Sequence, residues 1–179
     1  LAKQLEKFGA KVYNQYADLE AWDGTILKAR NIIGAYNPDS KKRIMLCAHW
    51  DSRPYADYDA DEKNHKKPID GANDGASGVG VLLEIARQIQ KEAPAVGIDI
   101  IFFDAEDYGT PAWHRGTYKP HDWCLGSQYW GRTPHVQGYY ARYGILLDMV
   151  GGKGGTFYYE PYSDRTAREE VKKIWEKAH

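Results

Sequence analysis

The sequence predicts an α/β sandwich, in which helices cover both faces of a mixed, mostly parallel sheet. Two short apolar runs, Arg43 to His49 and Gly97 to Asp104, have the length and composition of buried central strands. Between them, Val79 to Lys91 carries apolar residues at the spacing of one helical face. A strand, a helix and a second buried strand in this order are typical of a three-layer domain.

Length and composition agree with a single globular domain. The chain has 179 residues, of which 42% are hydrophobic and 27% are charged, so one core is expected across residues 1–179. The formal net charge of -1 lacks the basic excess that nucleic-acid binding requires, which argues against such a partner. No apolar run approaches the roughly 18 residues that span a bilayer, so a membrane-spanning segment is not expected and the protein is predicted to be soluble.

The N-terminal elements are predicted from apolar spacing and turn residues. Leu1 to Phe8 is expected to form a short helix, followed by an extended or irregular segment over Lys11 to Leu19. Thr25 to Tyr36 is predicted to be a strand, because it mixes apolar and polar residues and ends at the turn residues Asn37-Pro38-Asp39. This turn predicts a hairpin with the strand at Arg43 to His49.

Later elements alternate with two long polar loops, Ser52 to Asp70 and Ala105 to Trp123. Loops of this length within a compact domain are usually functional or mobile. Three elements are expected after residue 124, namely a short helix over Leu125 to Arg132, a third buried strand over Tyr143 to Asp148 and a fourth strand over Thr156 to Tyr159. Ser163 or Asp164 is expected to cap a last helix that continues through Lys177.

Groups that bind cations follow the predicted buried strands. They are His49 and Asp51 after the first strand, Glu106 and Asp107 after the second, and Asp148 at the third. In open α/β sheets ligands bind beyond the carboxyl ends of the strands, so these groups are expected to converge at one sheet edge. Asp74 lies in a glycine-rich turn before the long helix, where small neighbours allow the backbone to approach a bound ion closely.

Collecting these carboxylates in one crevice is electrostatically costly unless a cation neutralises them. Zn²⁺ accepts this mixture of carboxylate oxygen and imidazole nitrogen, so the set predicts a zinc site. Taken singly, each group has a plainer role: Asp74 as a helix cap, the other acids as solvated loop or turn residues, and His49 as a core histidine. The ligand role of His49 is favoured because Asp51 is placed to accept a hydrogen bond that orients the ring.

Four short motifs resemble those of the zinc aminopeptidase and glutaminyl cyclase superfamily. They are His49-Trp50-Asp51, Gly71-Ala72-Asn73-Asp74-Gly75-Ala76-Ser77-Gly78, Phe102-Phe103-Asp104-Ala105-Glu106-Asp107 and Leu146-Leu147-Asp148-Met149-Val150-Gly151. The resemblance covers roughly His49 to Gly151 and implies a zinc exopeptidase-like fold. It implies that Asp74 and Asp107 bind metal and that Glu106 is the general acid/base. Asp148 then binds a second metal or orients the substrate, and His49 binds that second metal when it is present.

Flanking residues separate the two chemistries of the superfamily. Aminopeptidases that resemble this pattern usually have a polar residue where Leu147 stands and a small residue where Asp104 stands. These two positions, together with Ser52 and the segment Leu125-Gly126-Ser127-Gln128-Tyr129, look more like glutaminyl cyclases. The resemblance therefore implies zinc-dependent cyclisation of N-terminal glutamine to pyroglutamate with loss of ammonia. The alternative is a zinc aminopeptidase; one zinc ion is expected for a cyclase and two for an aminopeptidase.

The resemblance also implies partners and a missing ligand. The substrates are peptides with a free N-terminus, and the location is extracytoplasmic, periplasmic or secreted. The family supplies a further metal-binding histidine from a loop after the last strand, and no remaining histidine lies in a matching motif, so truncation at the C-terminus is expected. A third interpretation, a non-catalytic binding ectodomain, is disfavoured because such a module has no reason to keep the costly acidic cluster.

Trp113 and the cysteines complete the set of candidate residues. Trp113 lies in the loop after Glu106 and is a candidate hydrophobic wall for the glutamine side chain, with packing on its own loop as the alternative. Cys47 and Cys124 are expected to be buried free thiols, since two cysteines in a chain of this size rarely form a disulfide framework.

Overall fold

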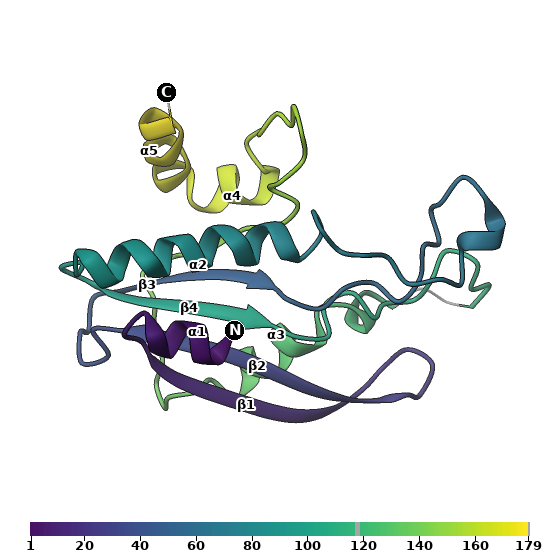
Figure 1. The fold of residues 1–179 in the computed structure, drawn as a ribbon, viewed down its shortest axis with the longest axis horizontal. Helices are drawn as coiled ribbons and strands as arrows, with labels where there is room; N and C mark the ends of the chain where they lie inside the picture. Colours follow the sequence, from purple (N-terminus) through teal and green to yellow (C-terminus); the bar gives the residue numbers. More distant parts are fainter. Residues whose placement is uncertain (117–118, 179) are drawn as a thin grey trace.

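A five-stranded mixed sheet of order β1-β2-β4-β3-β5 forms the centre of the computed structural model, which describes residues 1–116 and 119–178 (Figure 1). The strands are β1 (Lys11–Glu20), β2 (Ile26–Tyr36), β3 (Arg43–His49), β4 (Gly97–Phe103) and β5 (Gly144–Leu146). Strands β4, β3 and β5 run parallel to one another, whereas β1 and β2 form an antiparallel extension on one side. The predicted α/β fold with a mixed sheet is confirmed.

Helices cover both faces of this sheet. They are α1 (Ala2–Lys7), α2 (Ala76–Lys91), α3 (Leu125–Arg132), α4 (Pro161–Thr166) and α5 (Arg168–Ala178), with short 3-10 turns η1 (Glu62–Asn64) and η2 (Pro120–Asp122). Helix α2 lies along the sheet, and α4 and α5 lie beyond α2 on the side away from the strands (Figure 1). None of the helices within the described ranges is long and apolar enough to cross a membrane.

Successive residues of β4 point alternately into the two hydrophobic clusters, one on each face of the sheet. Ile100 and Phe102 are fully buried in the cluster that also holds Leu5 of α1 and Leu82 of α2. The next residue along, Ile101, faces the opposite side, in the cluster that packs against α3. Complete burial of such a side chain stabilises the fold by about 1.5–3 kcal/mol, so β4 contributes to both halves of the core.

A buried ion pair fixes the start of the parallel strands. Asp99 of β4 is 1% exposed, and both of its carboxylate oxygens accept hydrogen bonds at 2.7 Å from the guanidinium group of Arg43 on β3. Tyr139 also donates to Asp99, at 2.9 Å, and so connects the segment before β5 to the sheet. A buried charge is tolerated when paired and hydrogen-bonded in this way.

The predicted hairpin between the second and third strands is wrong. Strand β2 pairs with β1 through the turn at Ala21–Thr25 and with β4 on its other side, so β4 lies between β2 and β3. Strand β4 is buried along its whole length and therefore takes a central position, which leaves β2 outside it.

The predicted strands after residue 142 also need correction. Tyr143 to Asp148 contributes only the three-residue strand β5, and Leu146 is 61% exposed, so this strand is not buried as expected. Thr156 to Tyr159 is not a strand and is exposed. These segments are rich in apolar residues, but the pairing of β5 with β3 covers three residues only, and the edge-on contact of Tyr159 with Trp175 of α5 leaves Tyr159 45% exposed.

The last predicted helix is divided in two, and its cap was misplaced. Glu160, and not Ser163 or Asp164, caps α4 by accepting hydrogen bonds from the amides of Tyr162 and Ser163. Pro161 follows at the first helical position, where its missing amide hydrogen is harmless. Helix α5 then begins at Arg168.

A close approach between α2 and the sheet requires a glycine. A Cβ atom on Gly78 would collide with the carbonyl oxygen of Leu147 and lie 2.9 Å from Ala48 Cβ. Two residues further along the same helix, a Cβ atom on Gly80 would meet no atom within 4 Å. Gly78 is therefore tightly packed against neighbouring atoms, whereas Gly80 on the same helix has room for a side chain.

We expect Gly78→Ala to lower the free energy of unfolding by about 1–3 kcal/mol, because the added methyl group forces α2 from the sheet. Gly80→Ala is the matched control and should raise the free energy of unfolding by about 0.5–1 kcal/mol, because alanine has the higher helix propensity. Denaturant unfolding of both variants measures the difference. Equal effects of the two substitutions would contradict the packing argument.

Candidate metal centre

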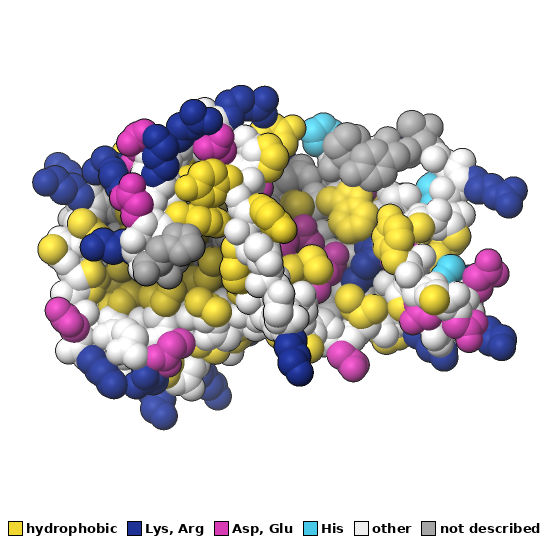
Figure 2. All heavy atoms as spheres, turned by 90° about the horizontal axis from the view of Figure 1, so that it is seen from above, with side chains coloured by type: hydrophobic (Ala, Val, Ile, Leu, Met, Phe, Trp, Pro, Cys, Tyr) yellow, Lys and Arg dark blue, Asp and Glu magenta, His cyan; other side chains and the backbone are white. Residues whose placement is uncertain are grey.

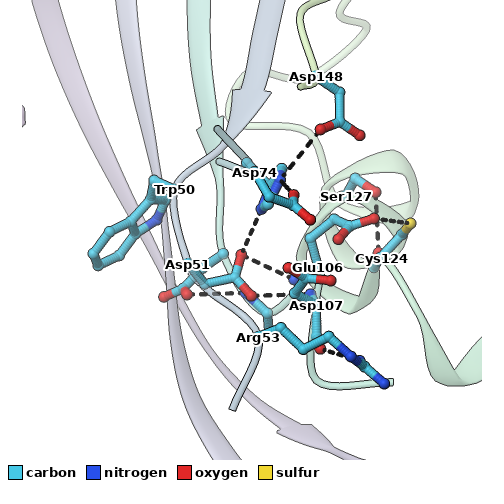
Figure 3. A network of polar contacts seen from close by, with 12 residues as sticks. Trp50, Asp51, Arg53, Asp74, Glu106, Asp107, Cys124, Ser127 and Asp148 are labelled. Atoms are coloured by element: carbon cyan, nitrogen blue, oxygen red, sulfur yellow. Dashed lines mark hydrogen bonds and ion pairs between the residues drawn. The ribbon is translucent and has the colours of Figure 1, made fainter. Parts of the chain in front are cut away.

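The predicted metal-binding and catalytic residues meet where the parallel strands end (Figure 3). His49 is the last residue of β3 and lies beside Phe103, the last residue of β4, in the parallel register. Asp148 follows β5 by two residues, and Asp74 precedes α2 by two residues. The expectation that these groups converge at one sheet edge is therefore met by the chain's topology.

His49 is the centre of two overlapping groups of side chains that could hold a metal ion. The first joins His49 with Asp74 and Asp148, and the second joins it with Glu106 and Asp107; ligand atoms within each group lie within 4.8 Å of one another. His49 Nε2 is 2.8 Å from Asp74 Oδ1 and 3.6 Å from Asp148 Oδ1. His49 is the one histidine in these groups within the part of the chain that the structure describes.

Asp51 organises the loop that follows β4. Its two carboxylate oxygens accept hydrogen bonds from the backbone amides of Glu106, at 3.1 Å, and Asp107, at 3.0 Å. Asp51 Oδ1 also lies 3.5 Å from Nδ1 of His49. The sequence predicted contact with the histidine ring, and the structure adds the two amide contacts, which place both acidic side chains beside His49.

Gly75 explains why a glycine-rich turn precedes α2. Its φ of 82° lies in the left-handed region that glycine adopts without strain. A Cβ atom there would lie 2.7 Å from the carbonyl oxygen of Asp51 and 3.1 Å from Cε1 of His49. Any larger residue would push the turn, and Asp74 with it, away from the histidine.

The close acidic groups shift one another's titration. Burial, reinforced by the charges of Asp74 and Glu106, raises the pKa of Asp107 to about 7. Burial also raises the pKa of Glu106. For His49, burial alone would lower the pKa, but the nearby carboxylates of Asp148 and Asp51 outweigh it and raise the pKa to about 11. The positive charge of the His49 imidazolium therefore offsets part of the negative charge of the surrounding carboxylates.

Two buried polar atoms at this site have no hydrogen-bond partner among the described residues. They are Oδ2 of Asp107 and Nδ1 of His49. A buried carboxylate oxygen without a partner is unfavourable unless a further group binds it, and a divalent cation is such a group. Carboxylate oxygens suit Zn²⁺, and His49 can join them as a ligand once its ring loses a proton, so the residues present fit a metal ion.

The site is open to solvent on one side. The side chains of Asp74 and Asp148 are 31% and 42% exposed, whereas His49 is 2% exposed beneath them. Figure 2 shows acidic side chains in a recess near the middle of one face, with hydrophobic side chains on either side. A small polar ligand can therefore reach the carboxylates from solvent.

Trp113 lies outside these groups. Its ring stacks on His65 at 6.4 Å between centroids and meets Tyr55 edge-on at 5.1 Å. Both partners belong to the long loop over residues 52–70, so Trp113 joins the two long loops and does not pack on its own loop alone. Its side chain is 37% exposed, and its contact with substrate stays a prediction.

A buried ion pair that no sequence motif predicted supports Asp107. Arg53 binds Asp57 through two hydrogen bonds of 2.7 and 2.6 Å, donates to the backbone carbonyl of Asp107 at 2.8 Å and stacks on Trp123 at 4.6 Å. Arg53 stands in a loop with several charged residues, and no local pattern distinguishes it from them. Only the contact with a residue 54 positions away reveals its role.

The cysteines are free, as expected, but only one is an ordinary core thiol. Cys47 is buried in β3, whereas Cys124 donates a hydrogen bond from Sγ to Oε1 of Glu106 at 3.1 Å. Burial, with the Glu106 hydrogen bond next in size, raises the pKa of Cys124 to about 12, so the thiol is protonated at neutral pH. The neighbouring motif Leu125-Gly126-Ser127-Gln128-Tyr129, which resembles cyclases, is the sequence feature that could have indicated that Cys124 lies near the site.

The sheet order and the carboxylate-histidine cluster at its parallel strand ends define an α/β domain with the zinc exopeptidase-like fold. The chain belongs to peptidase family M28, whose family model matches residues 31–179. The superfamily predicted from the four motifs is thereby confirmed.

Solved structures and a curated relative give the same relationship. The chain is 67% identical to a Bacteroides thetaiotaomicron glutaminyl cyclase solved with N-acetylhistamine, with a TM-score of 0.96 over 98% of this chain and 60% of that one. It is 60% identical to a Zn-dependent exopeptidase from Parabacteroides distasonis, with a TM-score of 0.95 over 98% of this chain and 60% of that one. Bovine glutaminyl-peptide cyclotransferase is 30% identical in an alignment 150 residues long that covers 71% of this chain and 38% of the bovine protein. The chain thus spans less than two thirds of these relatives.

We expect Zn²⁺ binding to release protons and to strengthen as the pH rises from about 6 to about 7.5, because metal ligands must be deprotonated. Asp107, whose pKa is about 7, is mostly protonated at the lower end of this range and mostly ionised at the upper end. Competition with a chelating dye at each pH gives the affinity. Equal affinity across the range would contradict a role for Asp107 in binding.

Proposed function

We propose that this chain carries the active site of a zinc-dependent glutaminyl cyclase, which converts the N-terminal glutamine of a peptide to pyroglutamate and releases ammonia. The observation that carries the proposal is the convergence of four carboxylates on His49 in a chain 67% identical to a glutaminyl cyclase. The flanking residues Asp104 and Leu147, which resemble those of cyclases, support the same choice.

Asp74 and Asp107 are the proposed zinc ligands, together with a further histidine that the family resemblance implies. Zinc bound there would act as a Lewis acid that polarises the side-chain amide carbonyl of the substrate glutamine. The partnerless Oδ2 of Asp107 supports its place among the ligands. His49 becomes a ligand only in the two-metal alternative; otherwise it is the cationic partner of Asp74 and Asp148.

Glu106 is the proposed general acid/base. The substrate's α-amine attacks its own side-chain amide carbon, so that a ring C–N bond forms, the original amide C–N bond breaks and ammonia leaves. Glu106 takes a proton from the amine and returns it to the departing nitrogen, which balances the reaction. Burial raises the pKa of Glu106 toward the operating pH, as a group that both accepts and donates a proton requires.

Asp148 is the proposed partner of the substrate amine. Its carboxylate is 42% exposed and lies in the same group as His49 and Asp74, so it faces the open side of the site. The amine and the amide carbon belong to one residue. Holding them next to each other therefore lowers the activation barrier for ring closure. The proposed substrates are peptides with a free N-terminus, with Trp113 as a candidate wall for the glutamine side chain and an extracytoplasmic location by family resemblance.

One observation keeps an aminopeptidase as the second candidate. The group of His49, Asp74 and Asp148 is itself suited to a metal ion, and two neighbouring metals are the arrangement of a hydrolase that activates water. The 60% identity to a Zn-dependent exopeptidase is compatible with this chemistry.

The products distinguish the two activities. When the full protein is incubated with zinc and a peptide that begins with glutamine, we expect ammonia and a peptide shorter by the mass of ammonia. Mass spectrometry and an ammonia assay measure both. Release of free glutamine would instead establish hydrolysis and overturn the cyclase proposal.

We expect Glu106→Gln to keep its zinc and to lower kcat by at least about 100-fold, since the amide cannot move the proton. Asp74→Asn should lose zinc together with activity, because it removes a charged ligand. Metal content and initial rates measure the two effects.

Glu92→Gln, which alters an exposed carboxyl group after the end of α2, is the matched control and should keep both zinc and rate. Equal turnover by Glu106→Gln and the unchanged protein would refute the acid/base role.

A further inference from the structure

The Glu106 carboxylate is held from one side only. Its single described hydrogen bond comes from Sγ of Cys124, which lies 3.1 Å from Oε1 (Figure 3). No hydrogen bond to Oε2 comes from residues 1–116 or 119–178. Oε1 is therefore anchored, and the same carboxylate lies in one group with His49 and Asp107.

Main-chain contacts fix Cys124 beside Glu106. The amide of Cys124 donates to the carbonyl of Glu106 at 3.0 Å, and the amide of Leu125 donates to the carbonyl of Ala105 at 3.0 Å. A Cβ atom on Gly126 would collide with the carbonyl oxygen of Asp104, so α3 can approach this segment only with glycine there. The N-terminus of α3 is thus attached to the segment that carries Glu106.

The backbone at Cys124 is unusual for a residue with a side chain. Its φ of 57° and ψ of 34° lie in the left-handed region, where glycine is favoured and other residues are strained. The conformation nevertheless directs the thiol at the carboxylate. A position that favours glycine on backbone grounds therefore holds a hydrogen-bond donor.

We propose that Cys124 is a positioning residue, whose thiol holds the Glu106 carboxylate in the orientation needed for proton transfer. This inference rests on the proposed acid/base role of Glu106. Free rotation would let the carboxylate turn from the substrate amine, whereas a donor on Oε1 restrains that rotation and leaves Oε2 free to exchange the proton. The thiol acts through Glu106 and does not itself react.

Other roles for the thiol are less consistent with the contacts. Both cysteines are free, and Cys47 bonds instead to the carbonyl of Ile145. Cys124 belongs to neither group of possible metal ligands in the described chain. Its remaining backbone group, the carbonyl, accepts hydrogen bonds from Ser127 and Gln128 within α3.

Two substitutions separate positioning from structural support. Cys124→Gly removes the thiol while relieving the left-handed backbone, so the midpoint of unfolding should not fall. We expect kcat for glutamine cyclisation to drop about tenfold with KM little changed and zinc content equal, because a hydrogen bond to a charged group is lost. Cys124→Ser keeps a donor and should recover most of kcat.

The results have distinct meanings. A Cys124→Gly variant as fast as the unchanged protein, or a Cys124→Ser variant as slow as the glycine variant, overturns the positioning role. Glu106→Gln is measured alongside: if it is also fully active, the proposed acid/base chemistry fails first. If Glu106→Gln is inactive and Cys124→Gly is unaffected, only the inference about Cys124 fails.

Discussion

The concentration of negative charge around His49 is the constraint on which the site depends. Asp74 and Asp148 form one group with the imidazole, and Glu106 and Asp107 form a second group with the same ring. Like charges this close disfavour ionisation, and the charges of Asp74 and Glu106 add to the effect of burial in raising the pKa of Asp107 to about 7. The protonated imidazole balances part of the charge, and a divalent cation would balance it more completely while using the free oxygen of Asp107.

The fold tolerates this arrangement because backbone contacts hold the loop that carries Glu106 and Asp107. Parallel pairing of β3 with β4 places His49 beside the loop that begins after Phe103, and Asp51 binds that loop through two amides. Arg53 also holds this loop, because its guanidinium group donates a hydrogen bond to the backbone carbonyl of Asp107. Each of these supports lies outside the cluster itself, so the acids are kept in place against their own repulsion.

Local sequence patterns predicted the features of this chain that depend on neighbouring residues, and they did not predict those that depend on distant contacts. The apolar runs of β3 and β4 and the helical stripe of α2 predicted buried elements, and the acids at their ends were assigned to one edge correctly. The hairpin failed because the order of strands depends on which strand is most completely buried, which no turn reveals. Cys124 and Arg53 were overlooked as site residues because their partners lie 18 and 54 positions away.

A crystal structure of the zinc-loaded protein, with anomalous scattering recorded at the zinc edge, tests the central claim most directly. The account predicts a strong anomalous peak bound by the carboxylates of both Asp74 and Asp107. A peak at any place that these two side chains do not reach, or a fully occupied zinc ion that leaves Asp107 unbound, would contradict it.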